Sequence, residues 1–538
     1  MNLFTEILKE SNASPIIWSI AGSDSSGGAG VQADLKTYTV LGSHGACVLT
    51  AITAQNTQGV LEIQPVGDTI FSSQLCALSE DLIPRAIKIG MISSAEQAKK
   101  IVTYLSRYPH CFRVYDPVRG STTGTGFFSK QELEIIIKEF LPHLDLITPN
   151  LLEAEEWLNY KIETTEDIEN AGKHFCELGA RAVLIKGGHF NSDFCMDFFT
   201  DGDEKFWITT ARIPQEEVHG TGCSFSSAIA HFCAQDYDLK DAIVLAKTWQ
   251  QQTIRYAQKL GKGQSFLKFN LPQAFKIASP DFPWVTKDPF DPLKRPKFPD
   301  CGEEFGLYTV VPDLRWLKRH LEVGVRTIQL RIKNPVGANP CVRPSRGANL
   351  RKTIQEAVRL AKEKGCRLFI NDHWQEAIEA KAYGVHLGQG DLDKLDPKFL
   401  EKGGLRLGVS THSYFEAARA HYYRPSYVAL GPIFKTESHP VSFSPQGTRG
   451  LKIWKKLFDY PLVAIGGIHL LHAQEILAEK VHGVCVMSEM LEEECVQTRF
   501  LKWRELFQKR NSLNLFSAEP SGNGLFFIKS KIFRKKSL

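Results

Sequence analysis

The sequence predicts two α/β domains, a doubly wound parallel sheet followed by a (β/α)8 barrel. Its 538 residues exceed what one ordinary hydrophobic core accommodates, so two domains are expected. Short apolar runs alternate with amphipathic stretches on both sides of a proline-rich window at 279–304. Two glycine-centred strand ends late in the chain stand in the order that a phosphate-binding barrel requires.

Eight apolar runs predict the strands of a barrel over residues 305–510. They are 306–312, 327–333, 368–372, 384–389, 406–412, 427–434, 463–468 and 483–488. The last two end in Gly466-Gly467 and Met487-Ser488, where backbone N–H groups of such a barrel can hold a phosphate. A Gly-Gly pair is often only a tight turn, but eight strand ends in order favour the barrel.

Polar side chains gather where these strands are expected to end, which is the active-site face of a barrel. Arg331 and Lys333 could neutralise an anionic leaving group. Asp372 and Asp391 could share one Mg²⁺ ion, although both precede helical stretches and could instead be helix caps. The same face carries Gln329, Asn371, Gln389, Ser410 and Thr411.

Composition narrows the class of protein. With 43% hydrophobic and 23% charged residues, the chain resembles soluble globular proteins. A net charge of +5 gives no case for nucleic acid as a partner but suits anionic small molecules. Twelve cysteines without CxxC or Cys/His spacing argue against zinc and disulfides and favour a cytoplasmic enzyme. We expect no signal peptide and no membrane partner. Homo-oligomers stay open, and the basic tail at 511–538 is either solvated or binds an acidic surface.

Residues 1–278 predict the doubly wound sheet, with strands at 16–21, 46–50, 86–89, 112–115, 146–147 and 182–186. A glycine-rich turn at 21–30 follows the first strand and precedes a helix, so it can approach an anion or a ring closely. The window 279–304 contains six prolines and is interpreted as a semi-rigid linker between the domains.

The segment 218–224 predicts a second anion site. Backbone N–H groups around Gly220 and Gly222, at a helix start, could hold a transferred phosphoryl group. Cys223 would lie at the helix N-terminus, where the dipole lowers a thiol pKa, although a buried structural cysteine is the alternative. Phosphoryl transfer also needs a carboxylate for Mg²⁺ and an ammonium for phosphate, for which Glu153 and Lys186 are candidates.

Together these motifs resemble the ribokinase-like superfamily, and within it hydroxymethylpyrimidine/phosphomethylpyrimidine kinase, over about residues 15–270. The segments 32–37, 53–57, 88–91 and 261–263 take part, and cysteine at 223 is typical of this branch. The resemblance implies a ribokinase-like sheet, ATP as co-substrate and Mg²⁺. On the substrate side, it implies that Gln55 binds the aminopyrimidine edge with Asp34 near the same pocket, and that Cys223 deprotonates the substrate hydroxymethyl. On the ATP side, it implies that Gly220 and Gly222 cradle the phosphoryl group and that Lys186 contacts the ATP phosphates. It further implies that Asn150 and Glu153 organise the nucleotide and Mg²⁺.

The barrel motifs resemble thiamine phosphate synthase over about residues 305–508, through 329–333, 371–372, 388–391, 408–412, 444–447 and 465–468 in order. The resemblance implies a dissociative reaction, in which pyrophosphate leaves and a thiazole nitrogen traps the pyrimidine cation. It also implies that Gln329 belongs to a strand end that binds pyrophosphate, and that Asn371 and Ser410 orient the pyrimidine and pyrophosphate. The thiazole phosphate would be held by Thr436, Ser438, Gly466, Gly467, Met487 and Ser488.

Two positions depart from these families. Arg119 replaces an apolar pocket residue of the kinase and could help hold a monophosphate. His439 stands where the synthase has a pyrophosphate-binding lysine, and Lys435 lies close to it in the sequence. We therefore expect a bifunctional enzyme of thiamine biosynthesis, with a ligand-binding sensor or a pyridoxal-type kinase as alternatives. Gln55 and Cys223 favour the aminopyrimidine over pyridoxal.

Overall fold

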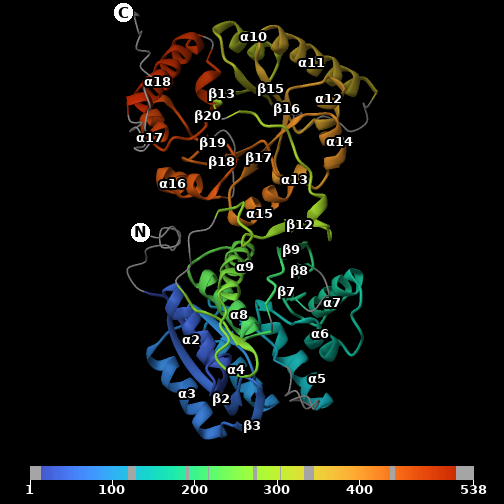
Figure 1. The fold of residues 1–538 in the computed structure, drawn as a ribbon, viewed down its shortest axis with the longest axis vertical. Coiled ribbons are helices and arrows are strands. Elements are labelled where there is room, and N and C mark those ends of the chain that lie inside the picture. The colour runs from blue at the N-terminus through green and yellow to red at the C-terminus, as the bar shows by residue number, and fades with distance from the viewer. Residues whose placement is uncertain are drawn as a thin grey trace, which may run out of the picture.

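The computed structural model describes residues 14–118, 129–188, 193–215, 217–270, 276–302, 304–332, 344–436, 443–492 and 494–516. An N-terminal α/β domain, blue to green in Figure 1, and a C-terminal barrel, yellow to red, lie one above the other along the long axis. The fold class is therefore the predicted one, whereas the boundaries given to the domains stay predictions.

A ten-stranded sheet forms the N-terminal domain, in the order β12-β9-β8-β7-β6-β5-β4-β1-β2-β3. Its parallel centre holds all six predicted strands: β1 (Ile16–Asp24), β2 (His44–Asn56), β4 (Ala86–Ile89), β5 (Phe112–Tyr115), β6 (Leu146–Ile147) and β7 (Val183–Ile185). Antiparallel strands that were not predicted extend it: β3 (Gly59–Pro65), β8 (Phe194–Thr200), β9 (Lys205–Ala211) and β12 (Trp284–Thr286). A separate parallel pair is β10 (Val218–His219) with β11 (Ser265–Phe266).

Helices bury both faces of this sheet, as a doubly wound fold requires. One hydrophobic cluster contains residues of α2 (Gly30–Leu41), α8 (Thr221–Ala234) and α9 (Leu239–Arg255). The other contains residues of α3 (Asp68–Asp81), α4 (Ala95–Leu105), α5 (Lys130–Glu139), α6 (Leu151–Leu158) and α7 (Thr165–Glu177). Helix α8 runs from the glycine turn at Gly220 toward the barrel, where Tyr237 packs against Tyr414 with ring centroids 6.2 Å apart.

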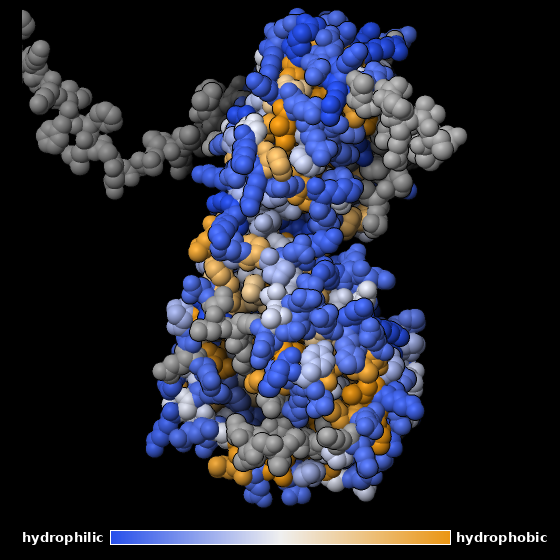
Figure 2. Space-filling model, turned by 90° about the vertical axis from the view of Figure 1, so that its right-hand side faces the viewer, coloured by the Kyte–Doolittle hydropathy of each residue, from blue (hydrophilic) through white to orange (hydrophobic). Residues whose placement is uncertain are grey.

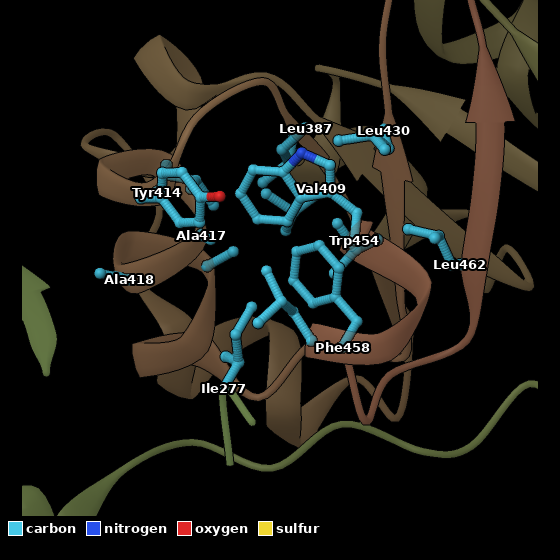
Figure 3. Packing of buried hydrophobic residues seen from close by; sticks show 14 of the residues in the cluster. Ile277, Leu387, Val409, Tyr414, Ala417, Ala418, Leu430, Trp454, Phe458 and Leu462 are labelled. Carbon is cyan, nitrogen blue, oxygen red and sulfur yellow. The ribbon is translucent and has the colours of Figure 1, made fainter. Parts of the chain in front are cut away.

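Eight parallel strands close the barrel: β13 (Gly306–Val311), β14 (Thr327–Leu330), β15 (Arg367–Asn371), β16 (Gly384–Leu387), β17 (Arg406–Thr411), β18 (Tyr427–Leu430), β19 (Leu462–Ile465) and β20 (Gly483–Val486). All eight predicted strands are present in order. The outer helices are α10 (Leu314–Val323), α11 (Pro344–Glu363), α12 (Trp374–Glu379), α13 (Gln389–Leu392), α14 (Pro397–Lys402), α15 (Tyr414–Tyr423), α16 (Gly447–Leu457), α17 (Ala473–Ala478) and α18 (Val496–Phe516). Figure 3 shows how Trp454 and Phe458 fill the space between strand residues such as Leu430 and the α15 residues Tyr414 and Ala417.

The window predicted as a linker docks on both domains. Its strand β12 pairs with β9 at the edge of the sheet, where proline nearby is tolerated. On the barrel side, the Arg295 guanidinium donates to the carbonyl of Tyr422 at 3.1 Å, and Arg424 donates to the carbonyl of Pro296 at 2.8 Å. Figure 2 shows apolar side chains, in orange, at the waist between the two lobes. The buried cluster that contains α8 and α9 also continues into the barrel. None of the helices in the described residues has the length and apolarity needed to span a bilayer.

Candidate active sites

The start of α8 is built to receive an anion. Gly220 has a φ of 81°, and a Cβ there would lie 1.9 Å from the carbonyl oxygen of Gly28, so only glycine fits. A Cβ on Gly222 would lie 3.1 Å from the Lys186 Nζ, which places this ammonium at the helix N-terminus. The structure thus brings together the two glycines and the lysine, in the arrangement of a phosphate site.

Lys186 is held by two carboxylates. Its Nζ lies 2.6 Å from Asp116 Oδ1 and 4.0 Å from Glu153 Oε2. Burial opposes the charged form, but Asp116 and Glu153 raise the pKa of Lys186, so it stays an ammonium. Asp116 was not predicted as a site residue, although it follows the apolar run 112–115 directly. Its carboxylate also accepts a hydrogen bond from Thr148 Oγ1 at 3.0 Å.

Asn150 and Glu153 form a capping box at the start of α6. Asn150 Oδ1 accepts the Glu153 N–H at 2.9 Å, and Glu153 Oε2 accepts the Asn150 N–H at 2.6 Å. The box fixes both side chains beside Lys186. Asn150 and Lys186 also line a cavity of about 520 Å³ that reaches Gly222, Phe225 and Gln251. This cavity has the size of a small-ligand site next to the anion cradle.

Cys223 is the third residue of α8 and lines a second cavity, of about 150 Å³. Burial raises the pKa of the Cys223 thiol to about 11, although the nearby Lys88 ammonium opposes this. The prediction of a helix N-terminal position is confirmed, but the expected lowering of the pKa is wrong. The reason is that burial disfavours the thiolate more than the helix end and Lys88 favour it.

Gln55 lines the same small cavity and is held by a chain of polar groups. Its amide nitrogen lies 3.0 Å from His219 Nε2, which in turn lies 3.0 Å from Asp24 Oδ2. Asp24 also accepts the backbone N–H groups of Gly28 and Ala29 at 3.0 and 2.7 Å, so it shapes the glycine-rich turn. Despite its burial, hydrogen bonds from His219 and Ser26 hold the pKa of Asp24 below its ordinary value. His219 and Asp24 were not singled out from the sequence, although both lie inside the quoted motifs.

Asp34 does not line that cavity. It is fully buried and forms an ion pair with Lys88 at 2.9 Å, and it accepts hydrogen bonds from Ser19 and Ser227 at 2.6 and 2.8 Å. Lys88, by contrast, is among the lining residues together with Cys223. Asp34 therefore reaches the pocket only through the ammonium that it holds.

The barrel carries a cavity of about 950 Å³ at the C-terminal ends of its strands. Predicted residues that line it are Gln329, Arg331, Asn371, Asp372, Asp391, Ser410, Thr436, Gly466, Gly467, Met487 and Ser488, and Lys435 also does so. Lys333, Ser438 and His439 lie outside the described residues, as does Arg119 of the other domain.

Two carboxylates face each other in this cavity. Burial and the neighbouring Asp391 raise the pKa of Asp372, while Arg331 opposes the rise. Neither aspartate caps a helix, because the N-cap residues of α12 and α13 are His373 and Gly388. The alternative of helix caps is therefore wrong. Two adjacent carboxylates that repel each other suit a shared divalent cation.

The Gly466-Gly467 turn forms the opposite wall of the cavity. Both glycines have positive φ, 94° and 66°, and a Cβ on Gly467 would lie 2.5 Å from the carbonyl oxygen of Lys435. The close backbone approach explains why the chain has glycine here. Such a turn exposes N–H groups to an anionic ligand.

A hydrogen-bonded chain supports the remaining polar residues. Gln329 Nε2 donates to Asn371 Oδ1 at 2.5 Å, and His386 Nε2 lies 2.9 Å from Ser410 Oγ. Burial, followed by the charge of Arg331, lowers the pKa of His386 to about 3, so its imidazole is neutral near pH 7. His386 was missed in the sequence because it lies inside an apolar run.

Comparisons with known proteins match both domains. Residues 24–268 match a family model described as phosphomethylpyrimidine kinase, and residues 307–490 match one described as thiamine monophosphate synthase. The thiamine biosynthetic bifunctional enzyme TH1 of Arabidopsis thaliana, described as chloroplastic, is 31% identical over 514 residues, which covers 91% of this chain and 92% of that protein. The chain belongs to the bifunctional enzymes of thiamine biosynthesis.

Each half of this bifunctional enzyme also has separate relatives. The hydroxymethylpyrimidine/phosphomethylpyrimidine kinase of Aquifex aeolicus is 38% identical over 254 residues, or 47% of this chain and all of that protein. The thiamine-phosphate synthase of Salmonella choleraesuis is 43% identical over 214 residues, or 40% of this chain and 93% of that protein. Two enzymes that occur separately are thus joined in one chain.

Proposed function

We propose that the N-terminal domain uses ATP to phosphorylate hydroxymethylpyrimidine and then its monophosphate, and that the barrel joins the resulting diphosphate to thiazole phosphate. Thiamine phosphate and pyrophosphate are the products. The observation that carries the kinase half is the convergence of Cys223, Lys186 and the glycine turn at the start of α8. For the synthase half it is the pair Asp372 and Asp391 opposite the Gly466-Gly467 turn.

In the kinase half, Gln55 would bind the aminopyrimidine edge, with its amide oriented by His219. Cys223 would accept the proton of the substrate hydroxymethyl as the hydroxymethyl oxygen attacks the γ-phosphorus of ATP, and ADP would leave as the bond between the γ-phosphorus and the β,γ-bridging oxygen breaks. The N–H groups around Gly220 and Gly222, with the Lys186 ammonium, would stabilise the charge on the transferred phosphoryl oxygens.

Magnesium belongs to the proposal for both halves. In the kinase, Glu153 and Asn150 would organise Mg²⁺ and the nucleotide, and Asp116 supplies a further carboxylate beside them. In the barrel, Asp372 and Asp391 would hold it. When bound, the ion neutralises phosphate oxygens and so favours departure of the leaving group.

In the synthase half, Arg331 and Lys333 would neutralise the pyrophosphate as its bond to the pyrimidine methylene carbon breaks. Asn371 would orient the pyrimidine, and Gln329 would hold the side-chain amide of Asn371 in place. Ser410 of β17 would also orient the pyrimidine. The thiazole nitrogen then attacks the pyrimidine methylene cation. The thiazole phosphate would be held by Thr436, Ser438, Gly466, Gly467, Met487 and Ser488.

One incubation tests both halves. The purified protein is mixed with hydroxymethylpyrimidine, thiazole phosphate, ATP and Mg²⁺, and thiamine phosphate is measured. Its formation would support the complete proposal. Omission of ATP should abolish the product, and supply of the pyrimidine diphosphate should restore it. A sensor with an inactive kinase would form thiamine phosphate only from supplied pyrimidine diphosphate, and one with an inactive synthase would form none in any mixture. The family matches do not favour a sensor or a pyridoxal-type kinase.

The proposed partners are small molecules only, with no nucleic acid and no membrane. The cytoplasm is the proposed place of action, which microscopy of a fluorescent fusion in the source cells would test. Self-association remains part of the proposal and is measured by sedimentation of the full chain.

The kinase reaction should respond strongly to pH. If the Cys223 thiolate is the base, turnover should rise about tenfold per unit between about pH 7 and pH 9. A pKa of about 11 leaves the thiol protonated there, so each pH unit multiplies the thiolate fraction by about ten. Initial rates at saturating ATP and Mg²⁺ measure this. A flat profile would show that the thiolate does not limit the rate.

Lys435 should matter to the barrel reaction if it replaces the lysine expected at position 439. Lys435→Ala should then lower coupling about tenfold or more, because the leaving pyrophosphate loses a fixed cation. His439→Lys should change little in that case. If His439 supplies the charge instead, coupling should weaken as the pH rises through about 6.5, and His439→Lys should remove that dependence. Coupling rates of both variants across pH decide between the two residues.

A further inference from the structure

The first turn of α15 is held by the kinase domain. Asp241 of α9 accepts the backbone N–H of Phe415 at 2.8 Å, and its carboxylate also bonds to the Ser413 side chain. Aromatic packing flanks this contact: Phe206 of β9 meets Phe415 at 4.8 Å, edge to face. In Figure 1, α15 is the barrel helix that lies next to β12 and α9 at the junction. One residue of the kinase thus completes the N-terminus of a barrel helix.

The same turn forms hydrogen bonds to a histidine of the barrel site. Ser413 is the N-cap of α15 and accepts the Glu416 N–H at 3.3 Å. Glu416 Oε2 accepts both the backbone N–H and the Nδ1–H of His412, at 2.8 and 2.7 Å. The imidazole also stacks on Phe443, with ring centroids 4.7 Å apart and planes 5° apart. His412 therefore has one orientation, set by Glu416 and Phe443.

His412 lines the barrel cavity and also the cleft between the domains. It follows Ser410 and Thr411 at the end of β17, and the cleft of about 1290 Å³ contains Asp241, Glu416 and His412 in its lining. Since Nδ1–H is donated to Glu416, the proton on Nδ1 is fixed and Nε2 is the nitrogen that can serve a ligand. A chain of contacts thus connects a kinase carboxylate to the wall of the synthase site.

We propose that Asp241 is a positioning residue for the synthase reaction: it fixes the first turn of α15, so that Glu416 holds His412 at the wall of the cavity, where His412 contacts the substrate. This inference rests on the proposed synthase function. It means that the kinase domain contributes to the barrel reaction although its own active site is elsewhere. Fusion then raises the activity of the synthase itself, in addition to joining two enzymes in one chain.

Asp241→Ala tests the proposal in the full-length protein. With supplied pyrimidine diphosphate and thiazole phosphate, synthase kcat/KM should fall about tenfold, because small displacements of site groups are costly. Kinase turnover, assayed separately, should stay within about twofold, since the contact lies at the far end of α9 from Gln250 and Gln251, which line the cavity beside Lys186. Asp241→Asn, which keeps an oxygen acceptor for the Phe415 N–H, should lose less.

Asp459→Ala is the matched control. Asp459 of the barrel likewise accepts a backbone N–H across the junction, that of Ala278 at 3.2 Å, and pairs with Lys276 at 2.9 Å, but it does not line the barrel cavity. This variant should weaken the junction without lowering synthase activity. Equal losses in Asp459→Ala and Asp241→Ala would overturn the proposal, as would a parallel loss of kinase activity.

A double-variant cycle separates positioning from general destabilisation. His412→Asn keeps a donor near Nδ1 but removes Nε2, so it should lower synthase activity on its own. If Asp241 acts through His412, adding Asp241→Ala to that variant should cost less than about twofold more. Losses that multiply would contradict the proposal. Should Asp241→Ala fail to fold, Glu416→Gln tests the next contact and should lower only the synthase reaction. A wild-type protein without any synthase activity would instead contradict the proposed function.

Discussion

Replacement of Cys223 by alanine is expected to lower kinase turnover by about two to four orders of magnitude, as for loss of a general base. The physical reason is placement: the thiol lies at the start of α8, between the cavity that contains Gln55 and the cradle formed by Gly222 and Lys186. Alanine leaves the cavity but removes the group that accepts the hydroxymethyl proton. Single-turnover phosphorylation of hydroxymethylpyrimidine measures the effect.

Two controls make this result specific. Cys233→Ala removes a second thiol from the same helix, outside both cavities, and should leave kinase turnover within about twofold. The barrel reaction of Cys223→Ala with supplied pyrimidine diphosphate should match that of the wild type. Unchanged kinase turnover in Cys223→Ala would remove the thiol from the mechanism and leave the alternative of a buried structural cysteine.

Replacement of Asp372 by asparagine should lower thiamine phosphate formation by about a hundredfold or more at ordinary Mg²⁺ concentration. Asparagine has nearly the same shape, so the loss reports the charge. Asp372 lies against Asp391, and the pair needs two negative charges to hold a divalent cation beside the leaving pyrophosphate. Raising the Mg²⁺ concentration should recover part of the activity, whereas ATP consumption on hydroxymethylpyrimidine should be unaffected.

Asp393→Asn is the comparison for this variant. Asp393 ends the same short helix as Asp391 but pairs with Arg419 and does not line the barrel cavity. Its replacement should leave coupling near the wild-type rate. Persistent coupling by Asp372→Asn at ordinary Mg²⁺ would show that the two carboxylates do not share the metal.

The predicted parallel strands were found because parallel strands buried on both faces are continuous apolar runs. The antiparallel strands were missed for the opposite reason. β3 is largely exposed, with Leu61 77% accessible, so it carries no such run. β12 has three residues in a proline-rich window and exists because it pairs with β9, a partner far away in the chain. Local pattern cannot show a strand that tertiary pairing creates.

The residues of the candidate sites also divide into those that local sequence reveals and those that only tertiary contacts reveal. Residues inside contiguous motifs, such as Gly220 and Gly222 or Asp372, could be picked out because their spacing carries the chemistry. Asp116, His386 and His412 were not picked out, although His412 lies inside the motif 408–412. Their roles depend on Lys186, Ser410 and Glu416, whose side chains meet them only in the folded chain. The prediction of a lowered pKa for the Cys223 thiol was wrong for a related reason. Burial raises this pKa, and burial depends on the surrounding fold rather than on the helix start.

The orientation of α8 has a consequence for the intermediate shared by the two reactions. Cys223 lies at one end of this 14-residue helix and the barrel contact through Tyr237 lies just beyond the other, roughly 20 Å away at 1.5 Å per residue. The proposed kinase site around Cys223 therefore lies about one helix length from this contact with the barrel. Whatever path the intermediate takes across that distance, fusion keeps the two catalysts in equal numbers.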